Sequence, residues 1–477
     1  METQSNQAGA VRTVDSLQKY ALTGPGPTLA EALGAFAAEL SSDTLPDEVA
    51  KLVELHIADS VGNGFAGATQ PFAQPVLELV ASAGGNPHAT VWGVGQRTSA
   101  SMAALANGVT MHGLDFDDTH TGAIVHAGAM VVPAALAVGE WKGASGAEVV
   151  VAAAAGYETA VRIGLAAPGR FHSHGFHATP LAGAFGAAVT TAKLLKLDAA
   201  GIAYAIGIVG SQASGIHEYA VDFRSWMKRF HAGWAAHGGV IGAQMAAGGF
   251  TSPRTVLEGP MGLFATHVGP DEWTPAVVTD RLGEHWETLD LSFKPYPSCH
   301  LTHSFIDAAR ELRGAVAVDS IESMHFKIAE GMLDMVEPWE QKLHPADEYA
   351  AKFSLPYCVA ALLWDGEVTV GSFGEDKIRR PDVLALASKA SYELDPHTTF
   401  PKAFPGEVTI RTVSGEALNN RMENSRGTPT KPLTEDEVHE KFVGNVALGR
   451  HGEHAERLWT SLSTLCAQDE LSAWHAL

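Results

Sequence analysis

The sequence predicts a mainly α-helical protein that consists of a large all-α domain and a smaller α+β lid domain. Apolar residues recur at helical spacing, almost without interruption, as far as about residue 285. Alternation of apolar and polar residues, the pattern of a half-buried strand, begins only after about residue 290. A chain of 477 residues is also longer than one hydrophobic core usually supports. These observations favour two folding units.

The first part of the chain is predicted to be a flexible tail followed by helices. Residues 1–24 are polar and mixed, and we expect them to form the tail. The helical domain is then expected to span residues 25–288. Within it, Pro46 suits a first helical turn, and apolar residues such as Val49 and Val53 follow at helical spacing.

The lid domain is predicted at residues 289–429. Its strands are expected at residues 320–328, 367–370 and 407–413, because apolar and polar residues alternate there. A capping box then opens a last helical stretch. We expect this stretch to return to the first domain, so that residues 430–477 continue the helical domain.

The segment Gly-Asn-Gly-Phe-Ala-Gly at residues 62–67 matches the GxGxxG motif of dinucleotide-binding proteins. That motif needs a strand before it and a helix opening from it. Here a helix precedes the glycines, so we interpret the segment as the end of that helix. A nucleotide site is therefore not predicted.

The composition indicates a globular, cytoplasmic protein. The chain is 46% hydrophobic and 18% charged, which is typical of a folded protein that does not span a membrane. The net charge of −22 argues against nucleic acid or an anionic membrane as a partner. The three cysteines are widely spaced and form no CxxC motif, so a reducing cytoplasm fits best. No secretory signal or membrane span is visible.

The stretch from residue 111 to residue 126 concentrates polar groups between two apolar segments. Buried polar groups require partners, ligands or trapped water. We therefore predict an active-site loop between two core helices. Helix capping by Asp117, Asp118 or Thr119 is the alternative. The polar residues of the stretch are Asp115, Asp117, Asp118, Thr119, His112, His120 and His126.

A second polar cluster precedes the glycine- and alanine-rich segment at residues 181–195. His172, His174 and His177 have the spacing HxHxxH, which invites comparison with a metal site. The spacing lacks the helical i, i+4 geometry, and no completing carboxylate is evident. We expect His177 to be an acid–base group at the start of a helix, and we expect no bound metal.

Two clusters of basic residues are candidate anion sites. Lys228, Arg229 and His231 precede a predicted helix, whose free amide groups attract anions. A solvated basic turn is the alternative for this cluster. Lys294 stands at the predicted domain boundary, where clefts preferentially form. The neighbouring Cys299 lies near a helix start, but a thiol nucleophile is the weaker interpretation because no partner is evident.

The combination of cations, imidazoles and carboxylates favours proton abstraction next to a substrate carboxylate. Lysine and histidine would hold the developing negative charge. The sequence offers no phosphate loop, haem motif, flavin motif or GxSxG motif. A metal hydrolase and a non-catalytic binding protein remain the alternatives from other classes.

Five of these stretches, in order along the chain, resemble the MmgE/PrpD family. This family includes 2-methylcitrate dehydratase, cis-aconitate decarboxylase and iminodisuccinate epimerase. The resemblance implies a helical domain with a smaller α+β lid, a homodimer, and activity without a metal or organic cofactor. The matching stretches are HGLDFDDTH (112–120), GFHATPLAGAFGAA (175–188), KRFHAGWAAHGG (228–239), FKPYPSCHLTH (293–303) and FSLPYCVAAL (353–362).

The resemblance also suggests roles for individual residues. The family's catalytic positions would fall on Asp115, Thr119, His126, His177, Lys228, Lys294 and Tyr357. From periodicity alone, Tyr357 is a buried helix residue. His231, His303 and Arg229 are our candidates for binding the substrate.

We therefore expect a cofactor-independent lyase, either a dehydratase or a decarboxylase, that acts on a small di- or tricarboxylate. Its partner would be a small anionic substrate, with neither nucleic acid nor membrane involved. An epimerase of a dicarboxylate uses the same proton abstraction followed by return of a proton to the other face. A family member without catalytic activity is the further alternative.

Overall fold

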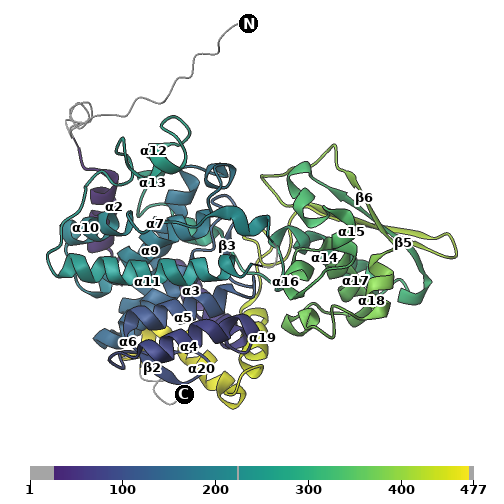
Figure 1. Cartoon of the computed structure of the whole chain (residues 1–477), viewed down its shortest axis with the longest axis horizontal. Helices are drawn as coiled ribbons and strands as arrows, with labels where there is room; N and C mark the ends of the chain where they lie inside the picture. Colours follow the sequence, from purple (N-terminus) through teal and green to yellow (C-terminus); the bar gives the residue numbers. More distant parts are fainter. Residues whose placement is uncertain (1–25, 223–224, 472–477) are drawn as a thin grey trace, which may run out of the picture.

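The computed structural model describes residues 26–222 and 225–471 of the chain. Within them the chain is mainly helical and forms two lobes, as Figure 1 shows. The mainly α-helical fold class is therefore confirmed. The predicted tail at residues 1–24 lies outside the described residues, as do residues 472–477 of the predicted C-terminal stretch.

Helices make up almost all of the larger lobe, and the smaller lobe combines short helices with a sheet (Figure 1). The helices of the larger lobe are α2 (Leu29–Glu39), α3 (Asp47–Ala68), α4 (Gln74–Ala83), α5 (Ala100–His112), α6 (Gly128–Lys142), α7 (Gly146–Leu165), α8 (Arg170–Ser173), α9 (Ala178–Leu194), α10 (Ala199–Val209), α11 (Met227–Ala247), α12 (Leu263–His267) and α13 (Pro275–Thr279). Those of the smaller lobe are α14 (His303–Arg313), α15 (Trp339–Leu343), α16 (Glu348–Lys352), α17 (Leu355–Asp365) and α18 (Pro381–Ala387). The C-terminal helices are α19 (Glu435–Ala447) and α20 (Ala455–Ser463).

Helix α7 is a core helix of the larger lobe. It begins at a capping box, in which Ser145 and Glu148 bond each other's backbone amides. Its valine and alanine side chains are buried on all sides, as expected for an internal helix. A Cβ at Gly156 would lie 2.0 Å from the hydroxyl of Thr190, so glycine allows α9 to cross closely. Among the described helices, none combines the length and the apolar character needed to cross a membrane.

The segment at residues 62–67 does form the end of a helix, because α3 runs through these glycines and stops at Ala68. The glycines also have a packing role. A Cβ at Gly67 would lie 1.9 Å from the carbonyl oxygen of Thr110 in α5. The small residue therefore permits α3 and α5 to cross closely, beside the loop that follows α5.

The smaller lobe contains a four-stranded sheet with the order β6-β5-β7-β8. The prediction at residues 320–328 is confirmed: Met324, Phe326 and Ile328 of β5 are all fully buried. Strand β5 runs antiparallel to β7 and parallel to β6, and β8 pairs with β7. The strands are β5 (Ile321–Ile328), β6 (Ala390–Leu394), β7 (Gly406–Thr412) and β8 (Ala417–Met422).

The strand expected at residues 367–370 is wrong. Thr369 instead caps a 3₁₀ turn, η7 (Val370–Phe373), by a reciprocal hydrogen-bond pattern with Ser372. Strands β6 and β8 were not predicted. The side chains of both strands are exposed or half-exposed, so neither segment shows a clear alternation of apolar and polar residues. The strand expected at residues 407–413 is confirmed as β7.

The expectation of an entirely α-helical first domain is wrong in detail. Strands β1 (Ala89–Val91) and β2 (Gln96–Thr98) form a hairpin in the larger lobe. Strand β3 (Thr119–His120) pairs with β4 (Leu291–Ser292), which comes from the junction with the smaller lobe. Strands of two or three residues are too short to show a periodic pattern.

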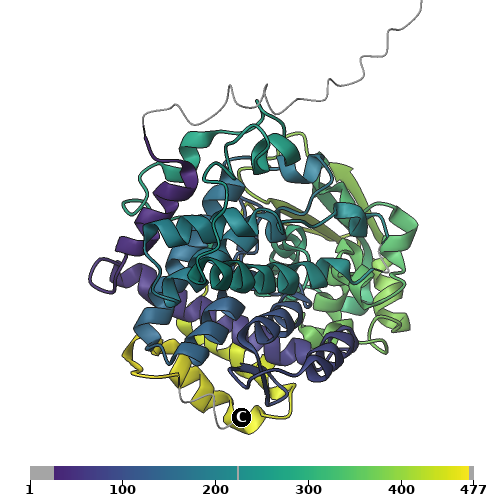
Figure 2. The same cartoon turned by 60° about the vertical axis from the view of Figure 1, so that its left-hand side comes forward.

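The two lobes have separate hydrophobic cores. One core contains residues of the first 293 positions together with the C-terminal helices, and the other lies between residues 296 and 410. Helices α19 and α20 lie beside α3 at the base of the larger lobe in both Figure 1 and Figure 2. The Lys441 ammonium of α19 pairs with Asp59 of α3 at 2.7 Å. The exact limits of the predicted domains stay predictions.

Candidate active site

Three carboxylates lie buried in the loop between α5 and β3. Asp115, Asp117 and Asp118 have at most 2% of their surface exposed. Asp115 also has a φ of 57°, a left-handed conformation that aspartate adopts more readily than most residues. Such backbone outliers cluster at functional sites. Each of these carboxylates has a different set of partners.

Asp115 is paired with two lysines that come from distant parts of the chain. Lys228, in the first turn of α11, bonds one carboxylate oxygen directly. Lys294 lies 3.3 Å from the other oxygen and donates a hydrogen bond of 3.0 Å to the Asp115 carbonyl. Burial alone would raise the pKa of Asp115, but the two ammonium groups hold it well below its usual value. Two buried ammonium groups therefore share the carboxylate of Asp115.

The pairing of β3 with β4 brings Lys294 to this loop. Thr119 lies opposite Ser292 in the antiparallel pair, and His120 lies opposite Leu291. Lys294 follows Ser292 by two residues, so the strand pair carries it towards Asp115. Both residues belong to polar clusters that the sequence pattern indicated as candidate sites, and the structure brings them together.

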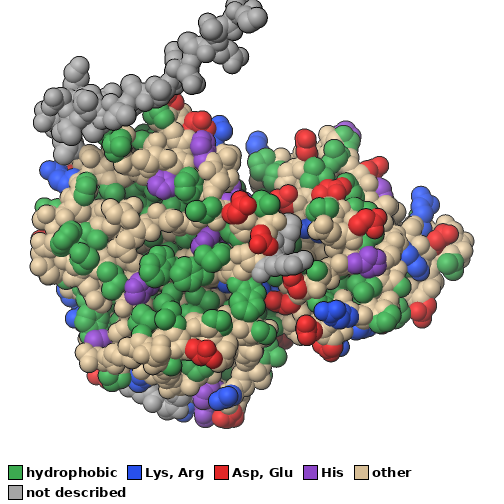
Figure 3. Space-filling view, in the orientation of Figure 1, with side chains coloured by type: hydrophobic (Ala, Val, Ile, Leu, Met, Phe, Trp, Pro, Cys, Tyr) green, Lys and Arg blue, Asp and Glu red, His purple; other side chains and the backbone are tan. Residues whose placement is uncertain are grey.

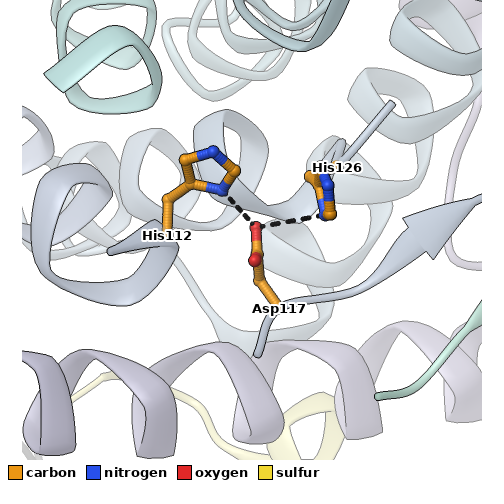
Figure 4. Close-up of side chains that lie close together, drawn as sticks. All are labelled: His112, Asp117 and His126. Atoms are coloured by element: carbon orange, nitrogen blue, oxygen red, sulfur yellow. Dashed lines mark hydrogen bonds and ion pairs between the residues drawn. The ribbon is translucent and has the colours of Figure 1, made fainter. Parts of the chain in front are cut away.

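Asp117 lies between two imidazoles, as Figure 4 shows. Its carboxylate is 2.7 Å from Nδ1 of His112 and 3.7 Å from Nδ1 of His126. Burial would raise the pKa of Asp117, but the two histidines lower it to about 2. The carboxylate is therefore ionised at neutral pH.

The hydrogen bonds of His126 and His112 determine their tautomers. Nδ1 of His126 lies 2.7 Å from the carbonyl oxygen of Asp118, which can only accept, so this nitrogen carries the proton. The Thr119 hydroxyl, 3.1 Å from the same nitrogen, then acts as a second acceptor. Nδ1 of His112 likewise donates to ionised Asp117. Nε2 of each ring is left with a lone pair, and burial lowers the pKa of His126 to about 3.

These tautomers bear on whether the residues could hold a metal ion. His112, Asp117 and His126 offer ligand atoms within 4.8 Å of one another. However, the nitrogens that face Asp117 are the protonated Nδ1 atoms, which cannot coordinate a metal. A similar group contains His120, whose Nδ1 accepts from the Ala123 amide and whose Nε2 therefore carries the proton. The donor sets fit hydrogen bonding better than metal coordination.

Asp118 faces the core behind the loop. It accepts hydrogen bonds from the amide of Gly128 and from the hydroxyl of Tyr157, each at 3.0 Å. The N-cap residue of α6 is Ala127, so the capping alternative is wrong in its strict form, although Asp118 does accept from the first amide of that helix. Burial, followed by the charge of Asp117, raises the pKa of Asp118 to about 7.

His177 and His231 lie on the other side of the cluster. Their Nδ1 atoms are 3.3 Å apart, and the ring of His177 lies 6.1 Å from that of His112. Burial lowers the pKa of His231 to about 4 and that of His177 well below its usual value, so both are neutral at pH 7. His231 also lines an open pocket of ≈ 470 Å³ beside Tyr219 and Trp234.

The other two histidines of the HxHxxH segment lie apart from the carboxylates. His174 is exposed, and its Nδ1 donates to the Arg170 carbonyl. His172 is half-buried, and its ring lies 5.0 Å from that of His217.

Arg229 is engaged by the smaller lobe and is not a solvated residue. Only 2% of its surface is exposed, and its guanidinium bonds Glu348 of α16 at 2.8 Å. It is stacked between the rings of Phe72 and Tyr349. The alternative of a solvated basic turn is therefore wrong for this residue. Substrate binding by Arg229, for which Glu348 would have to release it, stays a prediction.

The two remaining candidates, His303 and Tyr357, lie in the smaller lobe. His303 is fully buried and donates from Nε2 to the Ser298 carbonyl, while Nδ1 has no hydrogen-bond partner within the described part of the chain. The hydroxyl of Tyr357 donates to the Ser372 carbonyl at 2.6 Å, within the core of that lobe. The structure therefore does not bring the Tyr357 hydroxyl to Asp115 and its lysines. Its predicted role stays a prediction.

Sequence reasoning missed Lys352 and gave no role to the pair of His112 and Asp117. Lys352 is buried, and it donates to the carbonyl oxygens of Leu114 and Pro297 at 3.0 and 2.9 Å. Nothing in its segment distinguishes it from an ordinary lysine of a short helix. The histidine and aspartate were visible as polar residues of the loop, but their pairing depends on the turn that follows α5.

The fold and the site together define a two-lobed, mainly α-helical protein with a buried lysine–carboxylate cluster where the lobes meet. Family models agree with this description. The MmgE/PrpD N-terminal domain matches residues 31–276, and the MmgE/PrpD C-terminal domain matches residues 296–463. The chain belongs to the MmgE/PrpD family.

Curated relatives extend over most of the chain. Cis-aconitate decarboxylase of Aspergillus terreus is 27% identical over 431 residues, which cover 85% of this chain and 87% of that protein. Cis-aconitate decarboxylase of Homo sapiens is 28% identical over 415 residues, which cover 84% of each chain.

Proposed function

We propose that the protein is a lyase that acts on a small tricarboxylate, with removal of CO2 from a substrate like cis-aconitate as the first candidate reaction. The observation that carries the proposal is the pair of lysines, Lys228 and Lys294, on the single buried carboxylate of Asp115. The similarity to cis-aconitate decarboxylases supports the choice of substrate class.

The lysine pair suits a multiply charged substrate. Two ammonium groups that share one carboxylate can attract an anion locally, despite the net charge of −22. A substrate carboxylate would replace Asp115 as the partner of one ammonium group. The same cations would stabilise the charge that develops when a bond to carbon breaks. Because the ammonium groups are already in place, they need little reorientation when the charge develops.

The other residues then have complementary roles. His126 and His177 are neutral and buried, so either can exchange a proton with the substrate without help from a metal or an organic cofactor. Thr119 and His231 line the same cluster as hydrogen-bonding groups for the substrate. We propose that His303, Arg229 and Tyr357 contact the substrate only when the smaller lobe moves closer to the larger lobe.

We further propose that the smaller lobe acts as a lid and that the protein is a cytoplasmic homodimer. The lid is supported by the contacts that Lys294 and Glu348 make with residues of the larger lobe. The dimer is supported by exposed apolar side chains on α11, where Met227, Trp234 and Met245 recur at helical spacing. Figure 3 shows hydrophobic side chains gathered on this face of the larger lobe. The three cysteines of the chain are unpaired, which suits a reducing compartment.

Dehydration and epimerisation are the alternatives for the same site, because each also begins with proton transfer at a carbon next to a carboxylate. A substrate panel distinguishes them. The protein would be incubated separately with cis-aconitate, 2-methylcitrate and iminodisuccinate, and products would be followed by NMR. We expect CO2 release from cis-aconitate. Turnover of 2-methylcitrate or epimerisation of iminodisuccinate alone would select the corresponding alternative.

A lysine variant tests whether the observed activity belongs to this site. We expect Lys294→Ala to lower kcat/KM by about 10²- to 10³-fold, because one of the two charge-stabilising donors is lost. Lys327→Ala is the matched control, since Lys327 is a partly exposed lysine of β5. If both variants keep wild-type activity, or if no member of the panel reacts, the proposed function is wrong.

A further inference from the structure

His112 and Asp117 form a buried imidazole–carboxylate pair at the centre of the histidine cluster (Figure 4). His112 has 2% of its surface exposed and lies at the end of α5. Its ring centroid is 5.1 Å from that of His126 and 6.1 Å from that of His177. The ring therefore lies close to both of the histidines considered above as acid–base groups.

The two nitrogens of His112 have different surroundings. Nδ1 donates to the Asp117 carboxylate at 2.7 Å, so this proton is fixed. Nε2 is buried and has no hydrogen-bond partner among the described residues. A buried nitrogen without a hydrogen-bond partner lowers the stability of the folded protein. Its presence therefore requires an explanation, such as a ligand or a catalytic role.

His112 is better suited than His126 to take a second proton and become a positively charged imidazolium. Nδ1–H of His126 donates its hydrogen bond to the backbone carbonyl of Asp118, which is neutral. Nδ1–H of His112 donates its hydrogen bond to the ionised carboxylate of Asp117. A carboxylate in this position orients the imidazole, selects its tautomer and stabilises the imidazolium that forms when Nε2 takes a proton.

We propose that His112, oriented by Asp117, is a further catalytic residue, and that its Nε2 exchanges the proton with the reacting carbon of the substrate. This proposal rests on the proposed lyase function and makes its acid–base step specific. His126 and His177 then border the substrate as neutral hydrogen-bonding groups, and the two lysines hold its carboxylates.

In a decarboxylation the step balances as follows. The bond between the substrate carbon and the leaving carboxylate breaks, CO2 departs, and the electron pair remains on the carbon. Before this, Nε2 of neutral His112 takes one proton from solvent and the imidazolium forms. The carbon then takes that proton from Nε2 and His112 returns to its neutral form, so that each turnover consumes one proton and releases one CO2.

The experiment compares His112→Ala with the wild type, using cis-aconitate as the substrate. We expect kcat to fall by about 10²- to 10⁴-fold, as for loss of a general acid, with KM changed only a few-fold. Added imidazole should restore part of kcat in this variant, because it can enter the space left by the ring. A histidine with a purely structural role would not show this rescue.

His120→Ala is the matched control, because His120 is a buried histidine of the same loop whose Nε2 faces Glu287. Imidazole should not change kcat in that variant. Asp117→Asn is the second test, and it can be used even if His112→Ala does not fold. The asparagine amide has nearly the same shape as the aspartate carboxylate. We expect Asp117→Asn to lower kcat at least tenfold with an unchanged KM, since the amide selects the wrong tautomer of His112.

The outcomes separate this proposal from the proposed function. If the wild type releases CO2 and either folded variant keeps its kcat, the role of His112 is wrong and the lyase function stands. Loss of activity in His112→Ala without rescue, together with unchanged kcat in Asp117→Asn, also overturns the role. A wild type that converts no member of the substrate panel overturns both.

Discussion

Asp118 differs from the other two carboxylates of its loop because, among the described residues, no lysine pairs with it and no histidine donates a hydrogen bond to it. Its oxygens accept from an amide and from a tyrosine hydroxyl, and Nδ1 of His56 lies 3.6 Å from one of them. Burial lowers the pKa of His56 to about 3, so this histidine provides no counter-charge at neutral pH. The protonated form of Asp118 is consequently favoured in the folded protein.

This difference predicts a pH dependence of stability. The pKa of Asp118 is raised to about 7, so the folded state binds this proton more tightly than the unfolded chain. Its contribution to the free energy of unfolding is present below about pH 4 and is lost as the pH rises towards 7. Asp118→Asn, which mimics the protonated acid, should remove that contribution.

Urea unfolding at pH 5 and pH 7 measures the effect. The wild type should lose more stability than Asp118→Asn between these two pH values. An equal loss in both proteins would show that Asp118 is ionised throughout, against this interpretation.

At this scale, the sequence indicated the loop residues but not their partners. Asp115, Lys228 and Lys294 were recognisable because charged residues next to apolar helices must be satisfied when they are buried. Their convergence on one carboxylate depends on β3 and β4, which are two residues long and give no periodic signal. The Tyr357 hydroxyl was assigned from resemblance alone, and its Ser372 partner lies in a 3₁₀ turn just beyond the strand expected at residues 367–370.

Helix α16 is the element that connects the smaller lobe to the charged cluster. Glu348 bonds Arg229, and Lys352 donates to the carbonyl oxygens of Leu114 and Pro297. Leu114 directly precedes Asp115, and Pro297 belongs to the segment that carries Lys294. One short helix therefore supports both halves of the lysine–carboxylate cluster.

Removal of the Lys352 ammonium should therefore impair activity through positioning. We expect Lys352→Met to lower kcat/KM by about 10- to 100-fold, because small displacements of charged groups are costly for catalysis. Thermal stability should change little, since the methionine also removes a buried charge. Steady-state kinetics and a thermal melt measure the two effects.

Lys389→Met provides the comparison, because Lys389 donates to the Ile321 carbonyl elsewhere in the same lobe. Equal kinetic effects of the two substitutions would contradict a specific role for α16. The sequence could not predict this role, since residues 348–352 have the composition of an ordinary short helix.

Over the whole molecule, the C-terminal helices close the larger lobe through buried polar contacts. Lys441 bonds Asp59 at 2.7 Å and the Phe116 carbonyl at 2.8 Å, while Asn445 bonds Asn63 at 3.0 Å. Return of this stretch to the first domain was expected from its apolar residues. The ion pair was not, because its members are more than 380 residues apart and each lies on an otherwise ordinary helix.

Breaking this pair should destabilise the protein strongly. Lys441→Met leaves Asp59 buried without its cation, which we expect to cost about 3–5 kcal/mol in the free energy of unfolding. The double variant Asp59→Asn with Lys441→Met should recover much of that loss. Denaturant unfolding of both variants measures the difference.

The chain offers a control that joins the same two helices. Lys51 of α3 pairs with Glu435 of α19 at 2.8 Å, but both side chains are more than 40% exposed. Lys51→Met should cost no more than about 1 kcal/mol. If Lys51→Met and Lys441→Met lower the free energy of unfolding equally, burial does not make the pair of Asp59 and Lys441 more important for stability than an exposed pair.

The measurement that tests the central claim most directly is a crystal structure of the protein with a bound tricarboxylate such as cis-aconitate. We predict that substrate carboxylate oxygens lie about 3 Å from the ammonium nitrogens of both Lys228 and Lys294. A tricarboxylate bound elsewhere, with both lysines still held by Asp115 alone, would contradict the account.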